Sequence, residues 1–183
     1  MTSSKLFALA AFAVTVALPA IAGARLTAAG AIESRFVAVG LAGLKIVGTT
    51  EGGSVTDDGT TLHVSIPLGA LTTGIPLRDR HMREKYLEVA TYPDAALDVA
   101  RTALAFPKTG SETSGDVPGV LRLHGQNKNV SVHYTARREG DTFKISGAMH
   151  INLSDFGIDI PKYMGIIVKP DIDVTVRFDA ADK

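Results

Sequence analysis

Residues 143–153, with the sequence FKISGAMHINL, alternate between apolar or small side chains and mostly polar ones over their whole length. One face of this stretch carries Phe143, Ile145, Gly147, Met149, Ile151 and Leu153. A period of two residues is typical of an antiparallel strand that has one buried and one solvated face. We therefore predict a long strand here, and the same pattern decides the fold of the rest of the chain.

The alternation recurs along the chain. It is clear in residues 61–68, 129–136 and 171–180, and weaker in 32–40, 43–53, 96–104 and 119–125. Turn residues separate these stretches, and Glu139-Gly140-Asp141 predicts a hairpin between two long strands. We interpret residues 108–119, KTGSETSGDVPG, as a flexible loop. The prediction is an all-β domain with minor α content: an antiparallel barrel or sandwich of about eight strands.

The composition favours a barrel with space inside it. A barrel of about eight strands is wide enough either to be filled by side chains or to hold one small ligand. The chain has no Trp, 4 Tyr and 7 Phe, so large fillers are scarce. Small residues such as Ala136, Gly147 and Val130 fall on the faces that we assign to the interior. A ligand cavity is therefore predicted.

The first 24 residues have the features of an export signal. Lys5 precedes an apolar run over residues 6–18 that is interrupted only by Thr15, and Pro19 ends the run before small-x-small cleavage sequences. An uncleaved anchor is the alternative, but the run is shorter than the roughly 20 residues that span a bilayer. We predict a signal peptide at 1–24 and a domain at 25–183 that is periplasmic or secreted. The absence of cysteine excludes disulfides and a lipoprotein anchor.

Charge and motifs exclude several kinds of function. The chain has 19 basic and 19 acidic residues, so nothing favours nucleic acid as a partner. No nucleotide-binding or serine-hydrolase motif occurs, and the five histidines lack the spacings that place two metal ligands on one helical face. We expect solvated surface histidines, no metal, no cofactor and no enzymatic activity.

Residues 71–87, LTTGIPLRDRHMREKYL, concentrate charge. They allow three interpretations: a catalytic cluster, a surface patch for an anionic partner, or the polar face of a helix. Pro76 suits a first helical turn, and Met82, Tyr86 and Val89 share one face. Asp79 and His81, two residues apart, would point about 200° away from each other on a helix. We therefore predict a helix that covers one end of the barrel.

Four stretches carry a resemblance to a known family: residues 71–99, 119–132, 149–159 and the terminal alternating strand. Their shared elements are Thr73-Gly74, Arg78-Asp79, His81-Met82, Tyr92-Pro93, the LRLHG of 121–125 and the SDFGI of 154–158. In these features the chain resembles the YceI-like polyisoprenoid-binding proteins. The resemblance implies a lipocalin-like barrel that encloses an isoprenoid or similar amphiphile. It also implies that Arg78 and Asp79 hold the covering helix through hydrogen bonds.

The leading hypothesis is a binding protein for a polyisoprenoid, a quinone or another long-chain lipid. Spacing and polarity give the candidate lining residues: Phe36, Phe143, Ile145, Met149, Ile151, Ile172, Val174 and Val176, with Met82 and Tyr86 closing the cavity from the helix. The alternative hypotheses are a filled barrel that acts through its surface, in partner binding or stress response, and an enzyme acting inside the cavity. Homodimerisation through an exposed strand or the helix is a further possibility.

Overall fold

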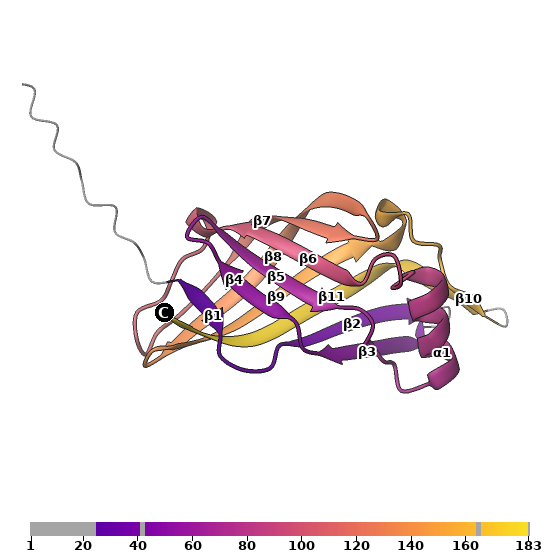
Figure 1. Cartoon of the computed structure of the whole chain (residues 1–183), viewed down its shortest axis with the longest axis horizontal. Helices are drawn as coiled ribbons and strands as arrows, with labels where there is room; N and C mark the ends of the chain where they lie inside the picture. Colours follow the sequence, from indigo (N-terminus) through magenta and orange to yellow (C-terminus); the bar gives the residue numbers. More distant parts are fainter. Residues whose placement is uncertain (1–24, 41–42, 164–165, 183) are drawn as a thin grey trace, which may run out of the picture.

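The computed structural model describes residues 25–40, 43–163 and 166–182, and shows an antiparallel barrel with one end covered by a helix (Figure 1). The ring consists of β1 (Leu26–Ala28), β4 (Ser54–Asp57), β5 (Thr61–Pro67), β6 (Asp94–Ala100), β7 (Glu112–Leu123), β8 (Gln126–Glu139), β9 (Thr142–Asn152) and β11 (Ile166–Asp182). Each strand pairs with the next in this order, and β11 pairs back with β1 to close the ring. The predicted fold class, a barrel of about eight strands with one covering helix, is confirmed.

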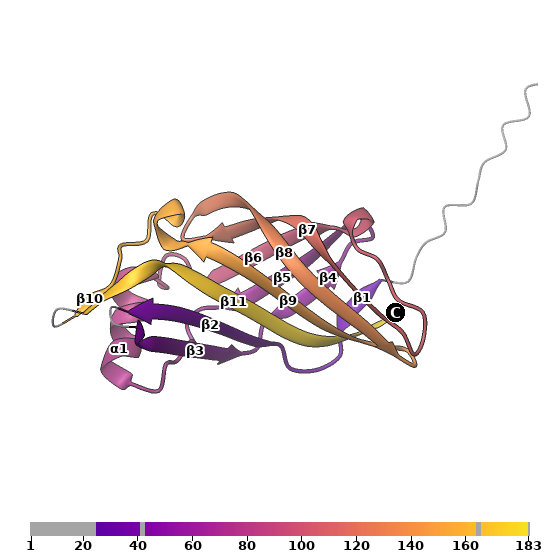
Figure 2. The same cartoon turned by 180° about the vertical axis from the view of Figure 1, so that it is seen from behind.

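A second hairpin extends the wall at the helix end. It consists of β2 (Glu33–Gly40) and β3 (Lys45–Glu51), and β2 pairs with β11 over Glu33–Gly40. Figure 2 shows β11 running between β9 and β2, with the short β10 (Lys162–Tyr163) projecting beyond the barrel. The free edge of β3 meets the loop after β5 through a two-way backbone bridge between Thr49 and Thr72.

All eight predicted strands are present, and β1, β4 and β10 were not predicted. They have only two to four residues, which is too short for an alternation to show. The loop predicted at 108–119 is wrong, because β7 begins at Glu112 and pairs with β8 along its whole length. The ladder between β6 and β7 stops at Gly119, so Pro118 lies where one edge of β7 lacks a β6 partner. A strand edge without a partner tolerates proline.

The covering segment is shorter and less regular than a single amphipathic helix. It consists of α1 (Pro76–His81), with Pro76 in its first turn, and a π-helical turn η2 (Met82–Tyr86). Val89, predicted on the same helical stripe, follows the segment. No helix among the described residues is long and apolar enough to cross a membrane. The signal peptide predicted at 1–24 lies outside the described residues.

The hydrophobic core forms three clusters, one at each end of the barrel and a third on β6, β7 and β8 that contains Val117, Val132 and Tyr134. At the β1 end, the side chains of Leu26, Ile32 and Phe143 pack with those of β4, β5 and β11 and are almost completely buried. At the α1 end, Phe156 of the 3-10 turn η4 (Leu153–Phe156) packs with residues of β7 and β9. The space between these clusters contains the candidate site.

Candidate functional site

The barrel encloses an apolar cavity of about 460 Å³. This volume lies in the range of roughly 300–1,000 Å³ that is usual for small-molecule sites. The wall is built from the inward-facing, alternate residues of the strands. Among the described residues, its basic members are Arg78, His81 and Lys162, from the lid and from β10, and it has no acidic member. An uncharged, elongated apolar molecule fits such a wall.

Nine of the ten predicted site residues lie on this wall: Phe36, Met82, Tyr86, Ile145, Met149, Ile151, Ile172, Val174 and Val176. The exception is Phe143, which is 2% exposed and packs in the core of the β1 end. Its ring contacts Phe106 edge-on at 6.1 Å between centroids, and the guanidinium of Arg138 lies over it. Phe143 thus closes one end of the barrel rather than lining the cavity.

The prediction missed much of the wall that lies opposite the long strands. Further lining residues come from β3, β5, β6, β7 and β8: Ile46, Thr50, Leu62, Val64, Ile66, Leu97, Leu121, Leu123, Val132, Tyr134 and Ala136. The alternation in residues 61–68 already identified three of these. The alternation in residues 129–136 likewise placed Val132, Tyr134 and Ala136 on one face, with Ala136 assigned to the interior. The lining residues of β3, β6 and β7 could not be assigned, because the pairing order of the strands was unknown.

Glycines make room for the large residues of the wall. The ring of Phe36 lies over Gly48, its direct partner on β3, so closely that a Cβ there would collide with the ring. Gly147 and Gly115 are the two cross-strand partners of Tyr134. The hydroxyl of Tyr134 accepts a hydrogen bond of 2.8 Å from the backbone N–H of Ala105. These contacts set the width of the cavity.

The lid is attached to the barrel by the polar residues that first suggested a catalytic cluster. Asp79 is 5% exposed and accepts hydrogen bonds from the Thr72 hydroxyl at 2.6 Å and from the Thr73 backbone N–H at 2.7 Å, as well as from the Thr73 hydroxyl. Arg78 donates to the Thr73 hydroxyl and carbonyl, at 2.6 and 2.9 Å. Burial would raise the pKa of Asp79, but these hydrogen bonds and the charge of Arg83 outweigh it and lower the pKa. Asp79 is therefore an ionised anchor of the lid.

Three of the family motifs meet next to the lid: His124 of the LRLHG motif contacts Phe156 of the SDFGI motif and Tyr92 of the Tyr-Pro motif. His124 and Gly125 form the two-residue turn between β7 and β8, with φ of 50° and 73°. The His124 ring lies 3.1 Å from the Phe156 carbonyl oxygen, 3.1 Å from a Glu88 carboxylate oxygen, and 4.6 Å between centroids from the Tyr92 ring. A Cβ on Gly125 would lie 2.9 Å from the Tyr92 ring, so glycine is needed there. The expectation of a solvated histidine is wrong for His124, whose side chain is 14% exposed.

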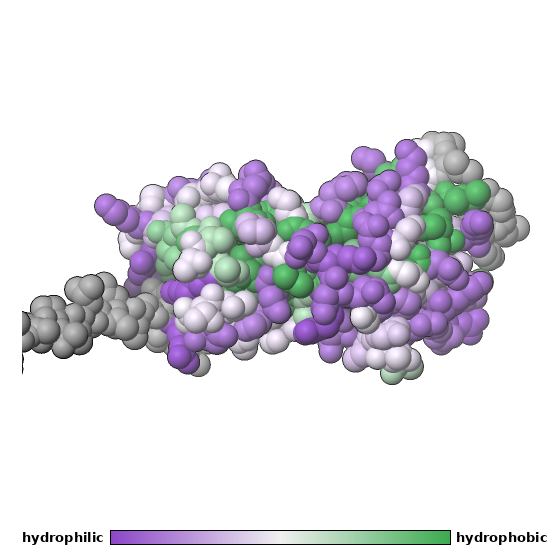
Figure 3. Space-filling view, turned by 90° about the horizontal axis from the view of Figure 1, so that it is seen from above, coloured by the Kyte–Doolittle hydropathy of each residue, from purple (hydrophilic) through white to green (hydrophobic). Residues whose placement is uncertain are grey.

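The lid end of the cavity has an exposed apolar rim. Leu44, Ile75 and Leu77 all line the cavity and are 51%, 50% and 44% exposed. Figure 3 shows hydrophobic residues at the end of the molecule that carries α1 and β10, bordered by hydrophilic ones. Arg78, His81 and Lys162 lie at this end, and His81 therefore belongs to the cavity wall rather than to the outer surface. We identify this end as the mouth of the cavity.

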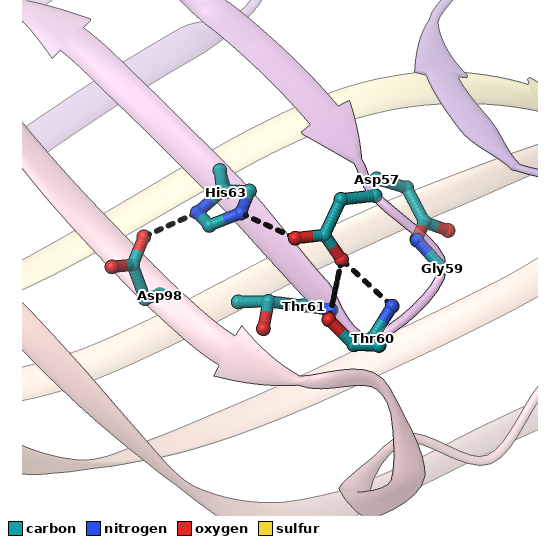
Figure 4. Close-up of polar contacts among 7 residues, drawn as sticks. Asp57, Gly59, Thr60, Thr61, His63 and Asp98 are labelled. Carbon is teal, nitrogen blue, oxygen red and sulfur yellow. Dashed lines mark hydrogen bonds and ion pairs between the residues drawn. The ribbon is translucent and has the colours of Figure 1, made fainter.

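Histidine–aspartate pairs occupy the outside of the barrel. His63 lies directly opposite Asp98 in the ladder between β5 and β6, and one ring nitrogen lies 2.7 Å from an Asp98 carboxylate oxygen (Figure 4). The other ring nitrogen lies 3.3 Å from an Asp58 carboxylate oxygen. The pairs His133–Asp116 and His150–Asp173 repeat this cross-strand arrangement. The hydrogen bond to Asp98, and then that to Asp58, raise the pKa of His63. Within the described part of the chain, no three acidic, histidine or cysteine side chains gather as a metal site.

The closed barrel, its apolar cavity and its helical lid place the molecule among the small β-barrel proteins with an internal cavity. Residues 28–180 match the model of the YceI-like domain, and the chain belongs to the YceI-like family. This family membership confirms the resemblance seen in the sequence motifs.

The chain is similar to a UPF0312 protein of Pseudomonas savastanoi pv. phaseolicola, with 29% identity over 133 residues, which are 69% of this chain and 65% of that protein. The chain thus matches about two thirds of the length of that curated relative. Among solved structures, a polyisoprenoid binding domain from Saccharophagus degradans has a TM-score of 0.71 at 19% identity, covering 88% of this chain and 99% of that one. BcnA of Burkholderia cenocepacia has a TM-score of 0.61 at 19% identity, covering 81% and 96%. These two structures share the fold.

Proposed function

We propose that this protein binds one long-chain amphiphile, such as a polyisoprenoid, a quinone or a similar lipid, inside the barrel, and that it carries no enzymatic activity. The enclosed apolar cavity of about 460 Å³ is the observation that carries the proposal. Each CH₂ group moved from water into such a cavity contributes about 0.8 kcal/mol. A long apolar chain can therefore bind firmly without charged contacts along its length.

The residues of the wall have distinct roles in this proposal. Phe36, Met149 and Val174 contact the apolar chain, while Met82 and Tyr86 cover it from the lid. An ionised or strongly hydrated head group stays at the mouth, where Arg78 and Lys162 lie. The similarity to a solved polyisoprenoid binding domain supports the class of ligand. The cavity argues against the filled barrel, which would leave no such space.

The test is to purify the protein, extract it with organic solvent and identify the extract by mass spectrometry. Added geranylgeraniol should also bind, as measured by displacement of a fluorescent lipid. Val132→Phe places a larger side chain in the cavity and should abolish both the recovery of a lipid and the binding of geranylgeraniol. Val120→Phe is the matched control, because Val120 is 41% exposed and does not line the cavity. A protein that yields no lipid and takes up no probe would contradict the proposal.

We further propose that the protein is exported and that residues 1–24 are removed. The basic start, the apolar run and the small residues before Arg25 support this location. Cell fractionation and N-terminal sequencing of the processed protein would test it, and an intact N-terminus on cytoplasmic protein would contradict it. Light scattering of the same material would show whether the exposed edges of the barrel pair two copies into a homodimer.

A further inference from the structure

Two hydroxyl groups interrupt the apolar wall deep inside the cavity. Ser34 on β2 and Thr50 on β3 are direct cross-strand partners. Both alternate in phase with lining residues of their strands, and both line the cavity. They therefore form a small polar site within an otherwise apolar stretch of wall.

These hydroxyls are short of hydrogen-bond partners. Thr50 is 3% exposed, and its hydroxyl makes one contact of 3.5 Å to the carbonyl of Glu51, at the limit of a hydrogen bond. The Ser34 side chain makes no hydrogen bond to any described residue. Of the other hydroxyls of the wall, those of Thr73 and Tyr134 have hydrogen bonds, because Thr73 binds the lid residues Asp79 and Arg78 and Tyr134 accepts from Ala105. The remaining one, that of Tyr86, belongs to the lid. Buried polar groups are normally paired, so a partner for the Thr50 hydroxyl is expected, and the hydroxyl of half-buried Ser34 lies on the paired strand beside it.

The polar site lies far from the mouth. Ser34 is six residues along β2 from Gly40, which pairs with Val168 and bonds to Leu44 near the mouth. At about 3.3 Å per residue, this is roughly 20 Å along the strand. The charged members of the cavity wall, Arg78 and Lys162, belong to the lid and to β10. Arg35 and Arg177 line an outer pocket next to Ser34 and Thr50, but they are not part of the cavity wall. An ionised group inside the cavity at the depth of Ser34 would therefore lack a counter-charge on the wall, which is unfavourable.

We propose that Ser34 and Thr50 bind an uncharged polar group of the amphiphile, a hydroxyl or a carbonyl oxygen, at the inner end of the cavity. This inference rests on the proposed function and narrows the class of ligand. Each hydroxyl can donate one hydrogen bond and accept others, so either an alcohol or a carbonyl compound satisfies the pair. The ligand thus enters with its neutral polar end first, and its apolar chain extends towards the lid.

The test compares three probes that each have an apolar chain of four isoprene units and differ in the end group: geranylgeraniol, the hydrocarbon phytane and geranylgeranyl diphosphate. Thr50→Val keeps the shape of the side chain and removes the hydroxyl. We expect Thr50→Val to weaken binding of the alcohol about five- to tenfold, the size of one hydrogen bond. Binding of phytane, which has no polar group, and of the diphosphate, whose charge stays at the mouth, should not weaken. Ser34→Ala should act in the same direction.

The matched control is Thr49→Val, because Thr49 is the preceding residue of β3 and is exposed on the outside. Thermal unfolding of each variant shows whether the barrel is intact. Equal weakening of all three probes, or unchanged binding of the alcohol, would overturn the inference while the proposed function stands. A wild-type protein that binds none of the probes would overturn both.

Discussion

The β1 end and the α1 end of the barrel hold their hydrophobic residues in opposite ways. At the β1 end, Leu26 and Ile32 are 1% exposed, and Phe143 fills the space between them and the neighbouring strands. At the α1 end, Leu44 and Ile75 are about half exposed around the mouth of the cavity. The long strands β8, β9 and β11 run through both ends, so the difference comes from the short strands and the connecting segments at each end.

The two ends also differ in the sequence separation of their polar contacts. Asp57 at the β1 end forms a buried ion pair with Arg101 and accepts hydrogen bonds from the N–H groups of Leu26 and Gly59, which joins β1, β4 and the segment after β6. Asp79 at the α1 end bonds to Thr72 and Thr73, only six or seven residues before it. Long-range contacts stabilise the whole barrel, whereas local contacts hold only the lid. We infer that one end supports folding and the other allows exchange of the ligand.

Removal of Asp57 is expected to have the largest effect. In Asp57→Ala the guanidinium of Arg101 loses its buried carboxylate partner, and such a loss typically costs about 3–5 kcal/mol of unfolding free energy. Urea unfolding followed by circular dichroism would measure it. Asp116→Ala is the control, because the Asp116 side chain is 70% exposed and should change stability little. Equal stabilities of the two variants would contradict the distinction between the ends.

Removal of Asp79 should affect the lid more than the barrel. Asp79→Ala leaves the donors of Thr72 and Thr73 without their carboxylate, and we expect a loss of about 2–3 kcal/mol at neutral pH. Release of geranylgeraniol should become faster, because the lid is attached less firmly. Stopped-flow displacement would measure the release rate, and Arg80→Ala, on the exposed face of the same helix, is the control.

The pH dependence of this effect has a definite sign. The pKa of Asp79 is lowered in the folded protein, so its ionised form stabilises the fold above the ordinary carboxyl pKa of about 4. That contribution is lost as the pH falls through the folded pKa. The stability difference between wild type and Asp79→Ala should therefore shrink in acid. A difference that is constant from pH 7 to pH 3 would contradict the role of the ionised carboxylate.

The sequence predicted the wall of the barrel better than its ends. The alternation of residues 143–153 requires one face to be buried, and Met149 and Ile151 line the cavity as predicted. The same alternation cannot show where along a strand the cavity stops. Phe143 continues the pattern of its strand, but its position opposite Ala180 places it in the filled end.

Pairing between strands and contacts between distant segments explain the other features that the sequence did not predict. The short strands β1 and β4 exist because β11 and β5 offer them edges, and their own residues carry no pattern long enough to detect. The polar site was missed because Ser34 and Thr50 are sixteen positions apart and meet only through the register of β2 and β3. The position of His124 was not predicted, because its contacts, Glu88 and Phe156, come from distant segments.

The smallest expected effect concerns the outside of the barrel, where the His63 side chain is 41% exposed. The hydrogen bond from His63 to Asp98, and then that to Asp58, raise the pKa of His63, so the protonated ring stabilises the folded state. This contribution is fully present below the ordinary histidine pKa of about 6.5 and is lost as the pH rises through the higher folded pKa. His63→Gln should therefore lower the unfolding free energy slightly at pH 5.5 and less at pH 9.

Asp98→Asn should lower it in the same way. At pH 5.5 the double variant should lose less unfolding free energy than the sum of the two single losses, because both substitutions remove the same interaction. Urea unfolding at the two pH values would measure this. Equal losses at pH 5.5 and pH 9 would show that the charge of His63 contributes nothing to the stability of the barrel.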